Sequence, residues 1–173
     1  MKYSGRDFLT GGLLLALALI LPLLFHALGL GSVFLPMFYP IIISGFLVAL
    51  PVAAAVGFLA PLTSAVLTGM PPLFPPLAFI MMAEGLVLAV IPAVFYQKYK
   101  LKILPTLALA IFAERVVLLA AVYFSARWLS LPEGVLGIAS LLRSLPGIIL
   151  IFLIVPPLVK KLEEALQRMP LLE

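Results

Sequence analysis

Residues Leu77–Tyr96 read LAFIMMAEGLVLAVIPAVFY, twenty positions with a single charged side chain, Glu84. A run of about 20 apolar residues is the length that a helix needs to cross a bilayer. The whole chain has a similar composition, because 65% of its 173 residues are hydrophobic and 10% are charged. Soluble domains have about 45–50% apolar and about 25% charged residues. The composition therefore indicates a polytopic membrane domain and excludes a soluble enzyme, a disordered chain and a nucleic-acid-binding module.

Further apolar stretches lie on both sides of this one. Backbone groups in lipid must be hydrogen-bonded internally, so each stretch is interpreted as a helix. The sequence predicts an all-α fold, a single domain over residues 1–173 with six transmembrane helices. The predicted spans cover residues 8–28, 35–50, 51–69, 77–96, 103–129 and 135–159. The proline-rich residues 70–76 are expected to be stiff and extended.

The positive charges predict the orientation of these spans. With six spans, eight basic residues fall on one side of the membrane, namely Lys2, Arg6, Lys98, Lys100, Lys102, Lys160, Lys161 and Arg168. The other side has Arg127 at a helix end. Since Lys and Arg favour the cytoplasmic side of short loops, both termini are expected to be cytoplasmic. The net charge of +4 follows from this asymmetry.

Four ionisable residues lie well inside the predicted spans: Glu84, Glu114, Arg115 and Arg143. A charge at the centre of a membrane helix costs about 2.5–3.5 kcal/mol on insertion scales, so these side chains should face protein or water. With about 1.5 Å of rise per residue, they reach the middle and outer half of the membrane. This distribution predicts a pocket that opens outward.

Each of the four also has a structural alternative. Arg143 lies close enough to the interface to extend towards it. Arg115 is deeper, so it either binds a ligand or pairs with Glu84 or Glu114. Because neighbouring helix residues point about 100° apart, we expect Arg115 to face the pocket and Glu114 to be a structural partner or subunit contact. Glu84 either lines the pocket or belongs to a buried ion pair. Two arginines favour an anionic or carbonyl-rich ligand.

Aromatic and Met side chains on the outer side are candidates for apolar ligand contact. They are Met37, Tyr39, Met70 and Phe74, and their alternative role is an aromatic belt at the interface. His26 is expected to be hydrogen-bonded near the end of the first span. The chain has one His and no Cys, which gives no support for a metal site or cofactor.

Several motifs are distributed along nearly the whole chain. They are Gly12-xxx-Ala16 in the first span, residues 35–40 (LPMFYP), Ser44-Gly45-Phe46, residues 57–64 (GFLAPLTS), residues 67–72 (LTGMPP) and Met82-Ala83-Glu84. In these motifs the chain resembles the substrate-binding S component of energy-coupling factor (ECF) vitamin transporters. Gly12 stands where that family usually has Ala in an Ala-xxx-Ala pattern.

The resemblance implies a non-enzymatic subunit in a prokaryotic plasma membrane. Such a subunit binds a vitamin or related micronutrient from outside, and a membrane coupling subunit with two ATPases energises its release. Gly12 and Ala16 would dock on the coupling subunit. The substrate-binding residues would be Arg115, Arg143, Glu84, Tyr39, Met37, Met70, Phe74 and His26, with the arginines pairing with an anion or carbonyl and Glu84 taking a hydroxyl or amine.

Three other classes remain open at the level of sequence. A six-helix membrane scaffold of a morphogenesis complex, similar to the rod-shape protein MreD, would explain a docking helix without a ligand. An intramembrane enzyme would need a nucleophile–base pair or metal motif, and the sequence offers neither pattern. A free-standing secondary transporter would work without ATPase partners.

Overall fold

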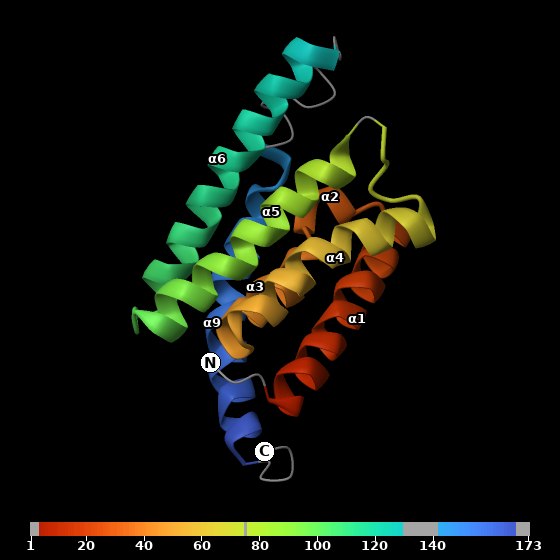
Figure 1. Ribbon diagram of the computed structural model, residues 1–173. Coiled ribbons are helices and arrows are strands. Elements are labelled where there is room, and N and C mark those ends of the chain that lie inside the picture. The colour runs from red at the N-terminus through yellow and green to blue at the C-terminus, as the bar shows by residue number, and fades with distance from the viewer. Residues whose placement is uncertain (1–3, 75, 130–141, 169–173) are drawn as a thin grey trace.

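Helices make up most of the described part of the chain (Figure 1). The computed structural model describes residues 4–74, 76–129 and 142–168, and no strand occurs among them. In chain order the helices are α1 (Gly5–Ala27), α2 (Gly31–Phe34), α3 (Phe38–Leu47), α4 (Leu50–Thr68), α5 (Leu77–Pro92), the π-helix η1 (Ala93–Lys98), α6 (Ile103–Leu129) and α9 (Leu145–Gln167). For these residues the predicted all-α fold is confirmed.

Five helical stretches in the described residues are long and apolar enough to cross a membrane. They are Gly5–Ala27, Leu50–Thr68, Leu77–Lys98, Ile103–Ser125 and Leu145–Gln167. The predicted second span, residues 35–50, differs, because the apolar stretch Gly31–Leu47 is shorter and is divided into α2 and α3. The first residues of the predicted sixth span, 135–141, lie outside the described residues. The helices thus support a membrane-embedded chain.

The short helix α3 occupies the middle of the bundle. Leu35 adopts a left-handed backbone conformation (φ 52°), which separates α2 from α3. Ten residues at about 1.5 Å each span about half of a 30 Å hydrocarbon core. Every residue from Pro40 to Phe46 is buried, and α1, α4, α5 and α9 all pack against this helix. A broken helix is tolerated at membrane depth when protein covers it, so α3 forms the centre of the core.

The end of α3 is held by a side chain from the π-helix. Helices leave their last carbonyl groups without partners. Gln97 in η1 donates from Nε2 to the carbonyl oxygens of Gly45 and Val48, at 2.7 Å each. The π-helix therefore satisfies backbone groups that would otherwise be unpaired inside the bundle.

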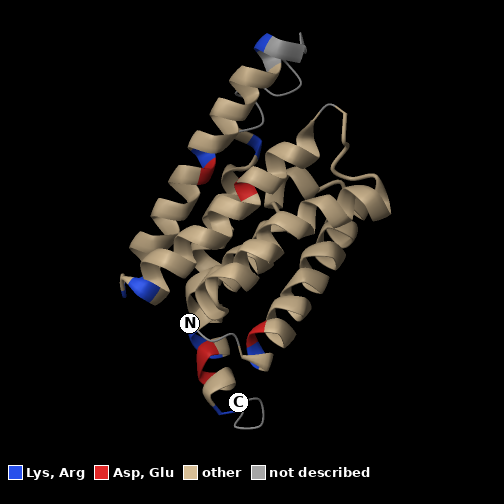
Figure 2. Cartoon of the chain, viewed as in Figure 1, with Lys and Arg blue, Asp and Glu red and all other residues tan. Residues whose placement is uncertain are grey.

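Polar contacts gather at the end of the bundle where α1 begins and α9 ends. Arg6 donates from Nη1 to the carbonyl oxygen of Leu166 at 3.1 Å. Tyr96 donates to the carboxylate of Glu163, with oxygen distances of 2.8 and 3.0 Å. Figure 2 shows both acidic and basic residues at this end. The start of α1 and the end of α9 thus lie on the same side of the bundle.

Asp7 joins two helices at this end. It forms a reciprocal capping box with Ser4, and its Oδ1 accepts a hydrogen bond from the backbone N–H of Ala49 at 3.1 Å. Replacing Asp7 with Ala should lower the free energy of unfolding by about 1–2 kcal/mol, because both interactions are lost. Thermal unfolding of the purified protein measures this loss. Asp7→Asn keeps an oxygen acceptor and should lose less, so an equal loss in both variants would contradict the hydrogen-bonding role.

Candidate binding site in the membrane interior

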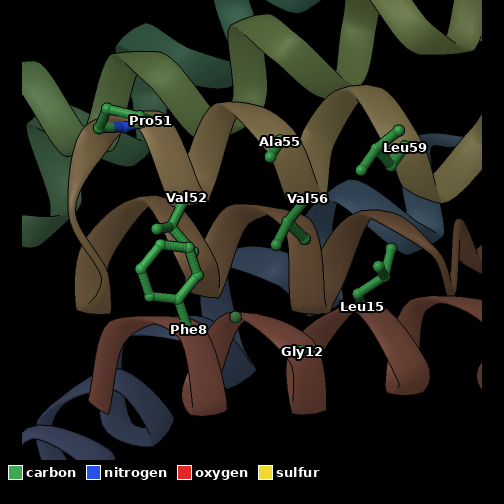
Figure 3. A pocket seen from close by; sticks show the side chains of 9 residues that line it. Phe8, Gly12, Leu15, Pro51, Val52, Ala55, Val56 and Leu59 are labelled. Atoms are coloured by element: carbon green, nitrogen blue, oxygen red, sulfur yellow. The ribbon is translucent and has the colours of Figure 1, made fainter. Parts of the chain in front are cut away.

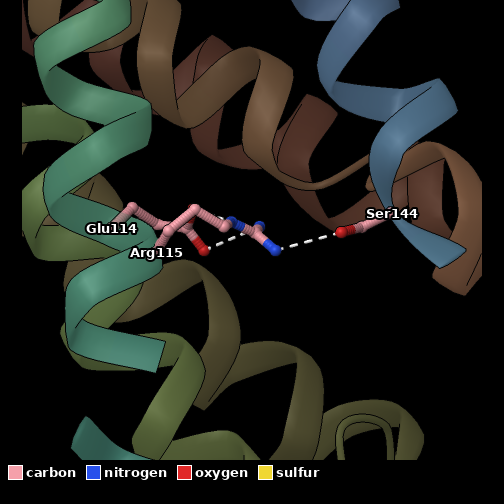
Figure 4. A network of polar contacts seen from close by, with 3 residues as sticks. All are labelled: Glu114, Arg115 and Ser144. Atoms are coloured by element: carbon pink, nitrogen blue, oxygen red, sulfur yellow. Dashed lines mark hydrogen bonds and ion pairs between the residues drawn. The ribbon is translucent and has the colours of Figure 1, made fainter. Parts of the chain in front are cut away.

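An ion pair within α6 is linked by a hydrogen bond to the start of α9 (Figure 4). Arg115 donates from Nε to Oε2 of Glu114 at 2.6 Å and from Nη2 to Oε1 at 2.9 Å. Its Nη1 donates to Oγ of Ser144 at 3.0 Å, and Ser144 directly precedes α9. Two parallel hydrogen bonds between a guanidinium and a carboxylate are the strong geometry for such a pair.

Glu84 on α5 adds a second carboxyl group to this network. Its side chain is hydrogen-bonded to that of Glu114 and lies close to Arg115. Glu114 is fully buried, Glu84 is 4% exposed, and the Arg115 side chain is 18% exposed. We name these three residues together with Ser144 the interior network. It places three ionisable groups where burial of charge is costly.

Helical periodicity explains why Glu114 points inward. The buried residues of α6 include Leu107, Ala110, Ile111 and Glu114. This spacing of three and four residues marks one face of a helix, so the fold of α6 on α5 carries Glu114 into the interior with its apolar neighbours. Arg115 lies beside that face and bends back to the same carboxylate.

A close contact between two glycines sets the position of Glu84. Gly85 on α5 lies against the backbone carbonyl of Gly57 on α4, and Gly57 lies against that of Gly85 in return. Any side chain larger than hydrogen would meet the facing backbone. Small residues of this kind allow membrane helices to approach closely. The contact fixes α5 next to α4 and so positions the neighbouring Glu84.

The two arginines predicted to bind a ligand lie in different environments. Arg115 takes the ion-pair alternative, with Glu114 as its structural partner. Arg143 is exposed, and it makes no hydrogen bond or ion pair within the described residues. The expectation that two arginines converge on one ligand group therefore gains no support from the placement of Arg143.

The outer aromatic and Met residues are placed in different environments. Met37 is buried in the core, and Tyr39 donates from its hydroxyl to the carbonyl oxygen of Gly147 at 3.3 Å. Met70 and Phe74, on the segment between α4 and α5, are 54% and 74% exposed. His26 is exposed, and its Nδ1 lies 2.8 Å from the carbonyl oxygen of Pro22, as expected for a residue near a helix end.

Ser144 is the member of the interior network that was not predicted from the sequence. Its one signal was its position between Arg143 and the apolar segment that begins at Leu145. Among the described residues, no group of three or more His, Asp or Glu side chains is placed to hold a metal ion.

A second feature is an apolar groove of about 440 Å³ between α1 and α4 (Figure 3). Its lining residues are Phe8, Gly11, Gly12, Leu15, Pro51, Val52, Ala55, Val56 and Leu59. Gly11 is buried against Val52, whereas Gly12 is exposed with no neighbouring atom within 4 Å of where its Cβ would lie. Ala16 is also exposed. Both residues of the predicted docking pair Gly12-xxx-Ala16 are therefore exposed on α1.

Comparison with known protein families, with curated proteins and with solved structures gives no match. The function must therefore be inferred from the residues of the chain. Two features are available for that inference, the interior network and the groove between α1 and α4.

Proposed function

We propose that this chain is the membrane-embedded substrate-binding subunit of an ECF-type transporter, which captures a vitamin or related micronutrient from outside a prokaryotic cell. The interior network is the observation that carries the proposal. Ionisable residues inside a membrane are costly and usually mark a substrate or ion pathway. Here three of them meet on α5 and α6, in a chain whose other helices bury almost only apolar side chains.

The orientation proposed from the basic residues places this network towards the outside. Both termini would be cytoplasmic, so the start of α1 and the end of α9 would form the inner end of the bundle. Helix α5 begins at Leu77, at the opposite end of the bundle, and Glu84 lies seven positions further along it. At about 1.5 Å per residue, Glu84 lies about 10 Å below that outer end. A ligand arriving from outside would reach it past the segment that carries Met70 and Phe74.

The groove between α1 and α4 would be the docking face for the coupling subunit. The chain contains no G-x-x-x-x-G-K-[ST] phosphate-binding motif, so the energy for transport would come from two partner ATPases. Exposed small residues let a partner helix approach the backbone closely. Gly12 and Ala16 offer such a surface beside the apolar wall formed by Val52 and Val56.

Gly12→Leu tests the docking face. The variant should fold normally, since no atom lies within 4 Å of the added Cβ, but its side chain would fill the groove and prevent close approach. We expect at least tenfold less coupling subunit and ATPase to copurify with it, which corresponds to about 1.4 kcal/mol of lost association. The readout is copurification from cells that express all four proteins.

Gly5→Leu is the matched control, because Gly5 is exposed on the same helix outside the groove and has equal free space. Equal copurification of both variants would contradict docking through this face. Uptake of a labelled vitamin that requires the ATPases would support the transporter as a whole. A chain that assembles with partners yet supports no uptake, and is stabilised by no vitamin, would favour the MreD-like scaffold.

A further inference from the structure

The charges of the interior network do not balance. It contains two carboxyl groups, Glu84 and Glu114, and one guanidinium group, Arg115. The helices α3 and α4, which also pack against α5, carry no charged residue, and Tyr39 is their one titratable side chain. The charged residues of α9 lie in its last turns, from Lys160 onward. Arg115 is ion-paired with Glu114, so Glu84 has no ion-pair partner of its own within the described residues.

Arg115 already forms hydrogen bonds to other residues of the network. It holds both carboxylate oxygens of Glu114 and the hydroxyl of Ser144. An anionic ligand at this guanidinium would have to displace one of these bonds. It would also add negative charge beside two carboxyl groups, which is electrostatically unfavourable.

Glu84 is the carboxyl group that receives no hydrogen bond from Arg115. It is almost fully buried, and no N–H group of the described residues donates to it. Its hydrogen-bonding neighbour is the carboxyl group of Glu114. A hydrogen bond between two carboxyl groups requires one of them to hold a proton. That proton occupies the place that a cation would take.

We propose that the interior network recognises a ligand with a positively charged nitrogen, a protonated or quaternary amine, and that Glu84 is its counter-charge. This inference rests on the proposed function and names its substrate class. When the cation enters, the O–H bond of the shared carboxyl proton breaks and the proton leaves to solvent. Ligand and protein form an ion pair and no covalent bond. The cation replaces the proton one for one, so the net charge of the network with its ligand remains zero.

The purified protein in nanodiscs provides the test. The probes are thiamine and choline as cations, riboflavin as a neutral compound, and biotin and pantothenate as anions. We expect a cation to bind and Glu84→Gln to weaken its binding by about 30-fold or more, as when one partner of a buried charge pair is lost. Glu84→Asp keeps the charge and should retain part of the affinity. Glu164→Gln, an exposed residue of α9, should leave binding unchanged.

Calorimetry in two buffers of different ionisation enthalpy adds an independent readout. The quaternary nitrogens of thiamine and choline have no proton to lose, so release of about one proton per bound probe would come from the protein. Binding without proton release would contradict the exchange at Glu84. Thermal unfolding of each variant shows whether it is folded.

Two results would overturn the cationic class. The first is tight binding of biotin or pantothenate that Arg115→Met abolishes and Glu84→Gln leaves intact, which would leave the transporter proposal standing. The second is the absence of any binding by thiamine and choline at millimolar concentration. Copurification with the coupling subunit decides the transporter proposal separately, so failure of the two can be distinguished.

Discussion

Replacing Arg115 with methionine is expected to lower the free energy of unfolding by about 3–5 kcal/mol. The substitution keeps a long, flexible side chain but removes the cation that holds Glu114. Two buried carboxyl groups would then face each other without a counter-charge, which is far more costly than the loss of an exposed ion pair. Denaturant or thermal unfolding of the purified protein in detergent measures the change.

Arg143→Met is the matched control for this loss. Arg143 is exposed and makes no ion pair within the described residues, so the same substitution there should change stability by about 0.5 kcal/mol or less. Adding Glu114→Gln to the Arg115 variant should recover part of the stability, because it removes one of the two uncompensated carboxyl groups. The double-mutant cycle gives the coupling between the residues. Similar behaviour of the two arginine variants would show that the interior network does not stabilise the fold.

The long helices were predictable from sequence because hydrocarbon imposes a minimum apolar length. The predicted span at residues 103–129 has the same bounds as α6, and the one at 51–69 differs from α4 by one residue at each end. The segment Gly31–Leu47 was not predictable in this way. Its break at Leu35 is possible because four other helices surround α3, and hydropathy along one segment contains no information about what covers it.

Part of the interior network could also be predicted from the sequence. The residues Leu107, Ala110, Ile111 and Glu114 share one helical face, which predicts that Glu114 is buried with its apolar neighbours. The angle of about 100° between adjacent residues indicates that Glu114 and Arg115 leave the helix in different directions. It does not describe the reach of an arginine, whose long side chain turns back to the neighbouring carboxylate. The bond to Ser144 depends on how α9 packs, which no local pattern specifies.

Replacing Gly85 with valine should also have a large effect. It should lower the free energy of unfolding by about 3 kcal/mol or more. Each glycine of the Gly57–Gly85 contact lies against the carbonyl group of the other. A flexible side chain could move aside, but here the obstacle is backbone in both helices. The added side chain would therefore force α4 and α5 apart along the contact. Unfolding measurements and the yield of folded protein report the effect.

The same substitution at Gly12 is the control. It distinguishes the effect of the backbone contact from the general effect of replacing a glycine in a helix. Gly12 is also a helical glycine, but open space surrounds it, so Gly12→Val should leave the stability of the isolated chain nearly unchanged. Equal stability of the two valine variants would contradict the close approach of α4 and α5. Because Gly85 neighbours Glu84, folded Gly85→Ala protein should bind its ligand more weakly than wild type, whereas Gly12→Ala should not. The two glycines thus test packing within the chain and docking outside it with the same substitution.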